Sequence, residues 1–180
     1  IAGFMIATAF ISMWVSNTAS TIMMLPIAVS VITIFSNQPN IRNENFAIPL
    51  LLAIAYSASI GGASTLIGTP TNIMLSSILS DSYNYEISFL DWLLIGLPVA
   101  IFLLPTVWFF LTNISFNVYK KKSNALERTI QEMRGEIGSP SFTEKIVATV
   151  FFLTATFWVL RRSLNEIFNL NLNDTSIGLL

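Results

Sequence analysis

Long apolar blocks without a charged residue alternate with short polar segments along this chain. The uncharged blocks cover residues 1–41, 45–80, 92–119 and 146–160. A membrane helix needs about 20 consecutive apolar residues to cross the hydrocarbon core, and most of these blocks reach that length. The pattern therefore predicts an all-α membrane protein and disfavours the core of a soluble helical domain.

Four membrane-embedded regions are predicted, at residues 1–36, 46–79, 92–114 and 144–160. Polar residues Ser16-Asn17-Thr18 interrupt the first region, and residues 68–72 interrupt the second. The third is a single span that contains two prolines, and the fourth is a shorter one. We expect two broken elements and two continuous transmembrane helices.

The lengths of the two interrupted regions indicate how they cross. Each arm of the first has about 16 residues, or about 24 Å of helix, which is less than a core of about 30 Å. A re-entrant hairpin open to the cytoplasm fits that length, and a truncated span followed by a second span fits it equally well. The second region would form about 51 Å of continuous helix, so a break near Gly68 is expected, with Pro70 opening the outer half-helix.

The charged loops set the orientation. Six of the nine Lys and Arg residues lie between Lys120 and Lys145, which places this loop in the cytoplasm. The acidic segment 80–91 then lies outside and 37–45 inside, although Arg161 and Arg162 would fall on the outer side. Within the predicted arm at 115–141, apolar residues recur at helical spacing, which indicates an amphipathic helix on the membrane surface: Leu126, Ile130, Met133 and Ile137.

Both ends of the sequence lie in apolar segments. Ile1 begins inside the first block, and residues 175–180 read as the start of a further helix. We therefore expect the sequence to be part of a longer chain.

Composition removes several classes of function. The chain is 53% hydrophobic and 11% charged, and it contains neither histidine nor cysteine. Disulfides, thiolate metal sites, zinc hydrolases and Ser–His hydrolases are excluded by that inventory, so we expect a protein that is not an enzyme. The chain also lacks a basic face, which argues against nucleic acid as a partner.

The two breaks carry the candidate chemistry. Carbonyls at the end of a half-helix suit a hard cation, and N–H groups at the start of the next suit an anion. Ser12 lies four residues before Ser16, which predicts that both project from one helical face. Their hydroxyls, the Asn17 amide oxygen and a carbonyl near Gly68 would form an uncharged oxygen cage, which suits Na⁺ better than a divalent ion.

An anion would meet neutral donors at the same breaks. Asn17, Thr18, Thr69 and Asn72 supply amide and hydroxyl groups, and neither block contains Lys or Arg. Scattered serines elsewhere are interpreted as helix-packing residues, and so is the pair Gly61-Gly62.

Several motifs together resemble the divalent anion:sodium symporter family. Ser16-Asn17-Thr18 is similar to its Ser-Asn-Thr signature, and residues 61–72, which read GGASTLIGTPTN, resemble the partner motif in its broken fifth helix. Residues 89–92 (FLDW), 96–98 (GLP) and 172–175 (LNDT) also resemble segments of that family.

The resemblance implies roles for individual residues. Sodium would be bound by Ser12, Ser16, Asn17 and the Gly68 carbonyl. The substrate carboxylate would meet Asn17, Thr18 and the Thr69-Pro70 turn. No cofactor is implied beyond Na⁺ as the coupling ion.

The resemblance also implies an architecture and a function. The chain would be the N-terminal half of an inverted-repeat, elevator-type carrier, a homodimer in the plasma membrane or, in a bacterium, the inner membrane. Its function would be sodium-coupled symport of di- or tricarboxylates such as succinate, malate or citrate. An anion exchanger, a sulfate or oxyanion carrier, and a non-transporting sensor or assembly subunit remain alternatives.

Overall fold

The computed structural model describes residues 1–36, 46–116, 118 and 141–168. All regular structure in these ranges is helical, as predicted. The chain divides into two compact units, Ile1–Lys120 and Lys121–Leu180, and each is described by itself.

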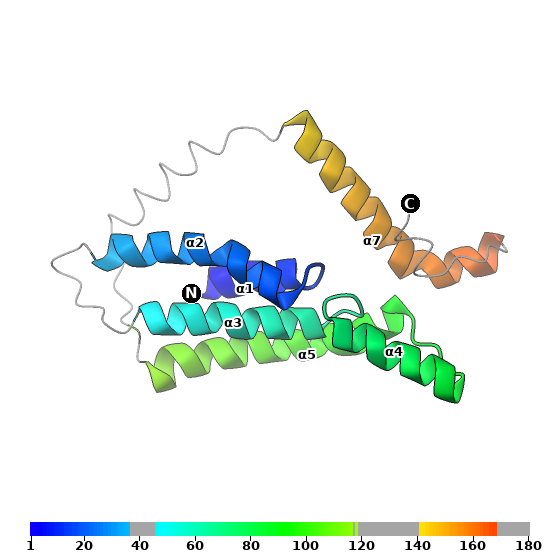
Figure 1. Ribbon diagram of the computed structural model, residues 1–180, viewed down its shortest axis with the longest axis horizontal. Coiled ribbons are helices and arrows are strands. Elements are labelled where there is room, and N and C mark those ends of the chain that lie inside the picture. Colours follow the sequence, from blue (N-terminus) through cyan, green and yellow to red (C-terminus); the bar gives the residue numbers. More distant parts are fainter. Residues whose placement is uncertain (37–45, 117, 119–140, 169–180) are drawn as a thin grey trace. The chain divides into compact units, whose positions relative to one another are not determined.

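The described residues of the first unit form five α-helices and a short π-helical segment (Figure 1). In chain order they are α1 (Ala2–Ser12), α2 (Asn17–Ser36), α3 (Ala47–Ala63), α4 (Pro70–Tyr83), α5 (Phe89–Phe109) and η1 (Phe110–Ser115).

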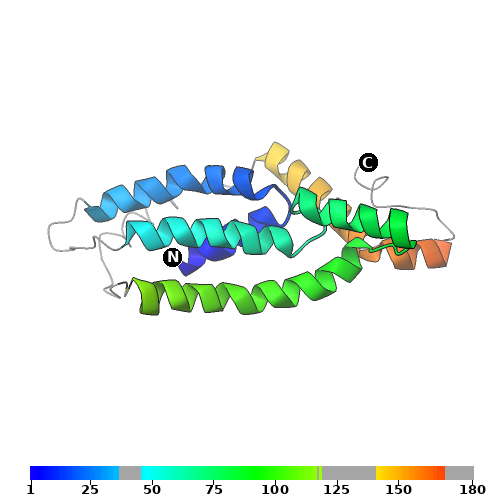
Figure 2. The same cartoon turned by 60° about the horizontal axis from the view of Figure 1, so that its bottom comes forward.

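Helix α3 is the centre of this unit. It packs against α1, α2 and α5, and Figures 1 and 2 both show it between α2 and α5. Leu50 and Ile54 of α3 meet Met24 and Ala28 of α2 in one buried cluster. A second cluster joins α1, α3 and η1 through Met5, Ala53 and Leu111. These contacts hold the helices that carry the two breaks.

The second predicted region is a broken helix. Helix α3 ends at Ala63, and α4 begins at Pro70 beyond the end of α3 (Figures 1 and 2). Thr69 is extended, with φ −138° and ψ 145°, and Pro70 occupies the first helical turn. A backbone N–H at that position would have no acceptor within the helix, so proline is tolerated there. Pro70 therefore opens α4 as predicted. The interruption covers residues 64–69 rather than 68–72, because residues 70–72 belong to α4.

The first predicted region is also divided into two helices. Helix α1 ends at Ser12 and α2 begins at Asn17, so Asn17 and Thr18 belong to α2 rather than to the connection. Helix α2 has 20 residues, against the 16 or so expected for each arm. At 1.5 Å per residue α2 is about 30 Å long, whereas α1, with 11 residues, is only about 17 Å long.

The third predicted region is a continuous helical stretch from Phe89 to Ser115, long and apolar enough to cross a membrane. It begins with a capping box, in which the side chains of Ser88 and Asp91 each accept a hydrogen bond from the other residue's backbone N–H. Pro98 and Pro105 lie inside α5 without ending it.

The second unit contains helix α7 (Phe142–Phe168) among its described residues. Its segment Phe142–Arg161 is the second one long and apolar enough to span a membrane. A hydrogen-bond pair between Ser141 and Glu144 opens it. The helix continues past the predicted limit at residue 160, so Arg161 lies within it.

Three predicted segments fall on other parts of the chain. The loop 37–45, nearly all of the arm at 115–141 and the segment 175–180 lie outside the described residues.

Candidate functional site

The two breaks lie against each other at Gly62, the penultimate residue of α3. A Cβ atom placed on Gly62 would overlap the Asn17 side chain and would come within 2.9 Å of the Thr69 methyl carbon. The Thr65 hydroxyl donates to the Met13 carbonyl at 2.5 Å, which ties the second break to the first. Residues from two interruptions some 50 positions apart along the chain therefore form one site.

Ser12 and Asn17 place two oxygen atoms at this site. Ser12 is fully buried, and its Oγ lies 2.7 Å from the Ala58 carbonyl and 2.9 Å from Asn17 Oδ1. A hydroxyl has one proton and two lone pairs, so Ser12 can donate to either oxygen and keep a lone pair for a cation. Ser12 and Asn17, two of the predicted sodium ligands, are thus in direct contact.

Ser16 takes a different position from the one expected. Because α1 ends at Ser12, the spacing of four does not place Ser16 on a shared helical face. Ser16 is exposed in the connection, and its Oγ accepts a 3.3 Å hydrogen bond from the Ala19 N–H in the first turn of α2. Thr18 is also exposed in that turn. Their hydroxyls thus lie near the N-terminus of α2.

Gly68 lies buried inside the second break. Its N–H donates to the Thr65 hydroxyl at 3.0 Å, and a side chain on it would overlap the Gly62 carbonyl. Gly62 in turn contacts Asn17. The predicted ion-binding residues Ser12, Asn17 and Gly68 are therefore connected through direct contacts at the end of α3.

Thr69 and Asn72 lie at the start of α4. The Thr69 and Thr71 hydroxyls are 2.8 Å apart and share a hydrogen bond. Asn72 Nδ2 donates to the Thr65 carbonyl at 2.8 Å and to the Gly62 carbonyl at 3.2 Å. The amide hydrogens of Asn72 therefore stabilise the break, and a substrate would have to compete with these carbonyls for them.

The electrostatics of the site come from helix ends. Helix α2 starts at Asn17 and α4 at Pro70, so two partly positive N-termini meet near Gly62. The sequence blocks 1–41 and 45–80, which contain both helix starts, carry no charged side chain. Among the described residues, no group of three or more acidic, His or Cys side chains could hold a metal ion. The arrangement suits a monovalent cation on neutral oxygens and an anion at the helix N-termini.

Two contributors to this site were not predicted. Thr65 connects the breaks, and Trp92 of α5 donates its indole N–H to the Ala63 carbonyl at 3.0 Å. Both belong to the motifs singled out in the sequence, residues 61–72 and 89–92. That membership was the only available signal for either role.

Comparison with known proteins identifies the family. The family model described as citrate transporter (CitMHS) matches residues 1–180. The chain is 38% identical over 169 residues to the sodium-dependent dicarboxylate transporter SdcS of Staphylococcus aureus strain USA300, a match that covers 90% of this chain and 32% of the relative. The same transporter from strain NCTC 8325 / PS 47 is 37% identical with the same coverage.

These matches confirm the predicted resemblance to sodium-coupled carboxylate carriers. The chain spans about a third of the length of these relatives. Both the family and the relatives are transporters and not enzymes, and transporters of this kind are integral membrane proteins. The chain belongs to the citrate transporter (CitMHS) family.

Proposed function

We propose that the protein carries out sodium-coupled symport of di- or tricarboxylate anions of the succinate, malate or citrate type. The observation that supports this most directly is the meeting of the two breaks at Gly62, with Asn17 between them. A site of neutral oxygens beside two helix N-termini can hold a monovalent cation and an anion next to each other. The relatives that match the chain are named as sodium-dependent dicarboxylate transporters.

In this proposal the sodium ion is bound by oxygen atoms from both breaks. The ligands are the side chains of Ser12, Ser16 and Asn17 and the carbonyl of Gly68. The buried Ser12 hydroxyl and the Asn17 amide are already 2.9 Å apart. No carboxylate takes part, which favours Na⁺ over a divalent cation.

The carboxylate substrate binds on the other side of Asn17. Thr18, Thr69 and the turn at Pro70 present hydroxyl and backbone N–H groups at the starts of α2 and α4, with Asn72 behind them. Since no Lys or Arg lies in either block, helix dipoles and the bound sodium ion supply the positive charge.

Coupling follows from the shared residue. Sodium binds first and fixes the position of Asn17 against Gly62, which brings the starts of α2 and α4 into the arrangement that holds the anion. Without sodium the two breaks are held by fewer contacts, and the affinity for the anion is lower.

The proposed architecture is a multi-pass carrier with α1 and α2 as a re-entrant hairpin and α3 and α4 as one broken transmembrane helix. The remaining two thirds of a protein of the relatives' length would supply the inverted repeat, with a second sodium site and the rest of the substrate pocket. An elevator-type movement within a homodimer completes the proposal. The pair of helices α1 and α2 and the interruption between α3 and α4 support the first part of this architecture, the hairpin and the broken helix.

Radiolabelled succinate uptake tests this function. The full-length protein is reconstituted into proteoliposomes, with either sodium or potassium outside. We expect uptake only with sodium. Counterflow without a sodium gradient would instead identify an exchanger, and no uptake of succinate, citrate or sulfate by a folded preparation would reject transport of these anions.

A further inference from the structure

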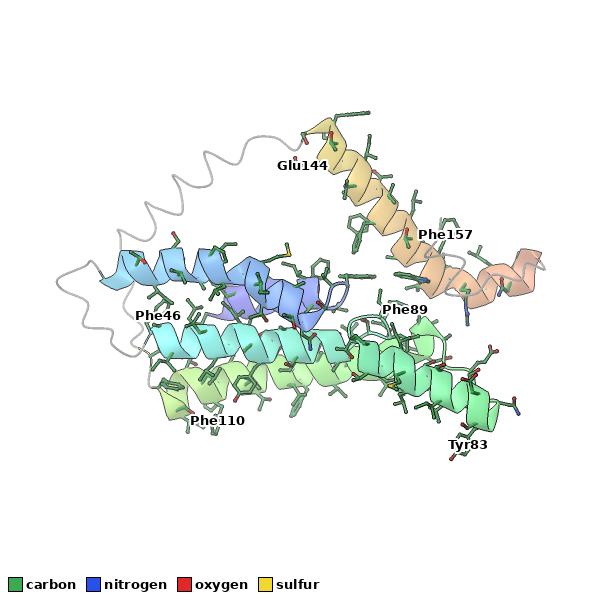
Figure 3. All side chains as sticks on the ribbon, in the orientation of Figure 1. Phe46, Tyr83, Phe89, Phe110, Glu144 and Phe157 are labelled. Atoms are coloured by element: carbon green, nitrogen blue, oxygen red, sulfur yellow. The ribbon has the colours of Figure 1, made fainter. Side chains whose placement is uncertain are left out.

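The first two turns of α5 contact both breaks. Phe89 is almost fully buried and stacks on Trp14 of the first break, with ring centroids 6.1 Å apart and an interplanar angle of 26°. Figure 3 shows Phe89 at the end of α5 that lies near the connection between α3 and α4. The start of α5 therefore lies against the hairpin connection.

The next turns of α5 hold the end of α3. The Trp92 indole N–H donates to the Ala63 carbonyl at 3.0 Å, as described above. One turn later, Gly96 is so close to Ser64 that a Cβ atom would lie 2.8 Å from the Ser64 carbonyl carbon and would overlap its oxygen. This close approach allows Trp92 to reach the carbonyl at the point where the helix ends.

The beginning of α5 is itself fixed by its cap. Asp91 Oδ2 accepts hydrogen bonds from the Ser88 N–H at 3.1 Å and from the Ser88 hydroxyl at 2.6 Å. The Asp91 N–H donates to Ser88 Oγ at 3.2 Å. Trp92 follows directly, so its backbone is held in the first turn of a capped helix.

The hydrogen bonds at the end of α3 show what the contact between Trp92 and Ala63 does. The last carbonyls of a helix lose their helical partners, and lipid supplies no donors. The Ser64 hydroxyl donates to the Gly61 carbonyl at 2.6 Å, and the Asn72 amide donates to the carbonyls of Gly62 and Thr65. The Trp92 indole donates to the Ala63 carbonyl. Side chains thus hydrogen-bond to four carbonyls at the end of α3 and in the break, and fix the positions of these carbonyls.

We propose that Trp92 is a positioning residue for the sodium site, an inference that rests on the proposed function. It touches neither ion nor substrate. By holding the Ala63 carbonyl, it fixes where the backbone leaves α3 and so where Gly68 lies against Gly62, which in turn contacts Asn17. Loss of the indole N–H lets the break move and reduces sodium affinity.

The test compares Trp92→Phe with Trp108→Phe, which lies on the same helix about 24 Å away. Both keep an aromatic ring. Trp92→Phe is expected to raise the sodium concentration for half-maximal succinate uptake about fivefold, the value of one neutral hydrogen bond. At saturating sodium, the KM for succinate should change less than about twofold. Trp108→Phe should leave both values unchanged.

Sodium-induced thermal stabilisation of the detergent-solubilised full-length protein provides a second readout that does not need transport. The shift at a fixed sodium concentration should be smaller for Trp92→Phe than for Trp108→Phe. If Trp92→Phe does not fold, Phe89→Leu is measured in its place, with Phe109→Leu as its control. The half-maximal sodium concentration should again rise, and the sodium-induced thermal shift should again be smaller than in the control.

The experiments distinguish failure of the proposed function from failure of the proposed role of Trp92. A wild-type protein that shows neither sodium-dependent uptake nor sodium-induced stabilisation would contradict the proposed function. A wild-type protein that shows both, with Trp92→Phe indistinguishable from Trp108→Phe, would overturn the role of Trp92 alone.

Discussion

At the residue scale, the Asn72 side chain connects the first turn of α4 to the unwound end of α3. Its amide donates to two carbonyls of the break, those of Gly62 and Thr65. We expect Asn72→Leu to destabilise the protein by about 2 kcal/mol or more, because two partly buried carbonyls lose their donor. Thermal unfolding of the ligand-free protein in detergent measures this loss.

The control for this substitution is Asn113→Leu. Asn113 donates to the Phe109 carbonyl four residues earlier in the same helical stretch, so its amide does not join separate elements. The loss of stability should be smaller for Asn113→Leu than for Asn72→Leu. Equal melting temperatures for the two variants would show that Asn72 does not hold the break.

Asn17 is the residue that the two proposed ligands share. Its Oδ1 lies 2.9 Å from Ser12 Oγ, and its side chain also contacts Gly62. We expect Asn17→Ala to weaken sodium and succinate together, raising the half-maximal concentration of each about tenfold. Uptake measured as a function of each concentration in turn checks this.

Thr33→Ala is the matched variant on the same helix, since the exposed Thr33 hydroxyl donates to the Val29 carbonyl one turn earlier in α2. It should leave both concentrations unchanged. A change in succinate affinity alone in Asn17→Ala would remove Asn17 from the sodium site.

Sequence reasoning at this scale identified residues that the structure brings together, including Ser12, Asn17 and Gly68. It singled them out because they lie at or next to the two predicted helix interruptions and within motifs that resemble those of the family. It misplaced Ser16, since the end of α1 depends on how the connection packs. It could not find the Trp92 contact, because the register between α5 and α3 fixes which carbonyl the indole reaches.

At the element scale, close approach of the two breaks depends on Gly62. A methyl group there would overlap Asn17 Oδ1 and press on Thr69, which would separate the starts of α2 and α4. We expect Gly62→Ala to lower sodium-driven succinate uptake at least about fivefold, because overpacking of this kind costs about 1–3 kcal/mol.

Gly3→Ala is the control, since nothing lies within 4 Å of a Cβ atom placed on Gly3. It is expected to transport at the wild-type rate, and both variants should be compared at equal amounts of folded protein. Wild-type uptake by Gly62→Ala would contradict the proposal that the breaks must approach so closely.

Element boundaries were predictable only approximately. The apolar blocks marked the helices, and Pro70 marked the start of α4 correctly. The interruption itself lies earlier than expected, at residues 64–69, because Pro70 is suited to the first position of a helix and the polar residues that follow it continue α4. For the same reason Asn17 and Thr18 join α2 behind the Ser16 cap.

At the scale of the whole molecule, the basic loop between Lys120 and Lys145 predicts the orientation of the chain. The absence of cysteine makes the test simple, because a single introduced cysteine is the only reactive thiol in this chain. In cells, Tyr83→Cys, at the exposed last residue of α4, should react with a membrane-impermeant maleimide added outside. Ser123→Cys should react only after permeabilisation, and the reverse pattern would contradict the predicted topology.

The central claim is that sodium assembles the anion site from two breaks. Equilibrium binding of radiolabelled succinate to the purified full-length protein tests it most directly, with measurements in sodium and in potassium at equal ionic strength. We expect saturable binding in sodium and at least about tenfold weaker binding in potassium, which corresponds to a coupling of about 1.4 kcal/mol. Equal succinate affinity in the two salts would contradict the claim.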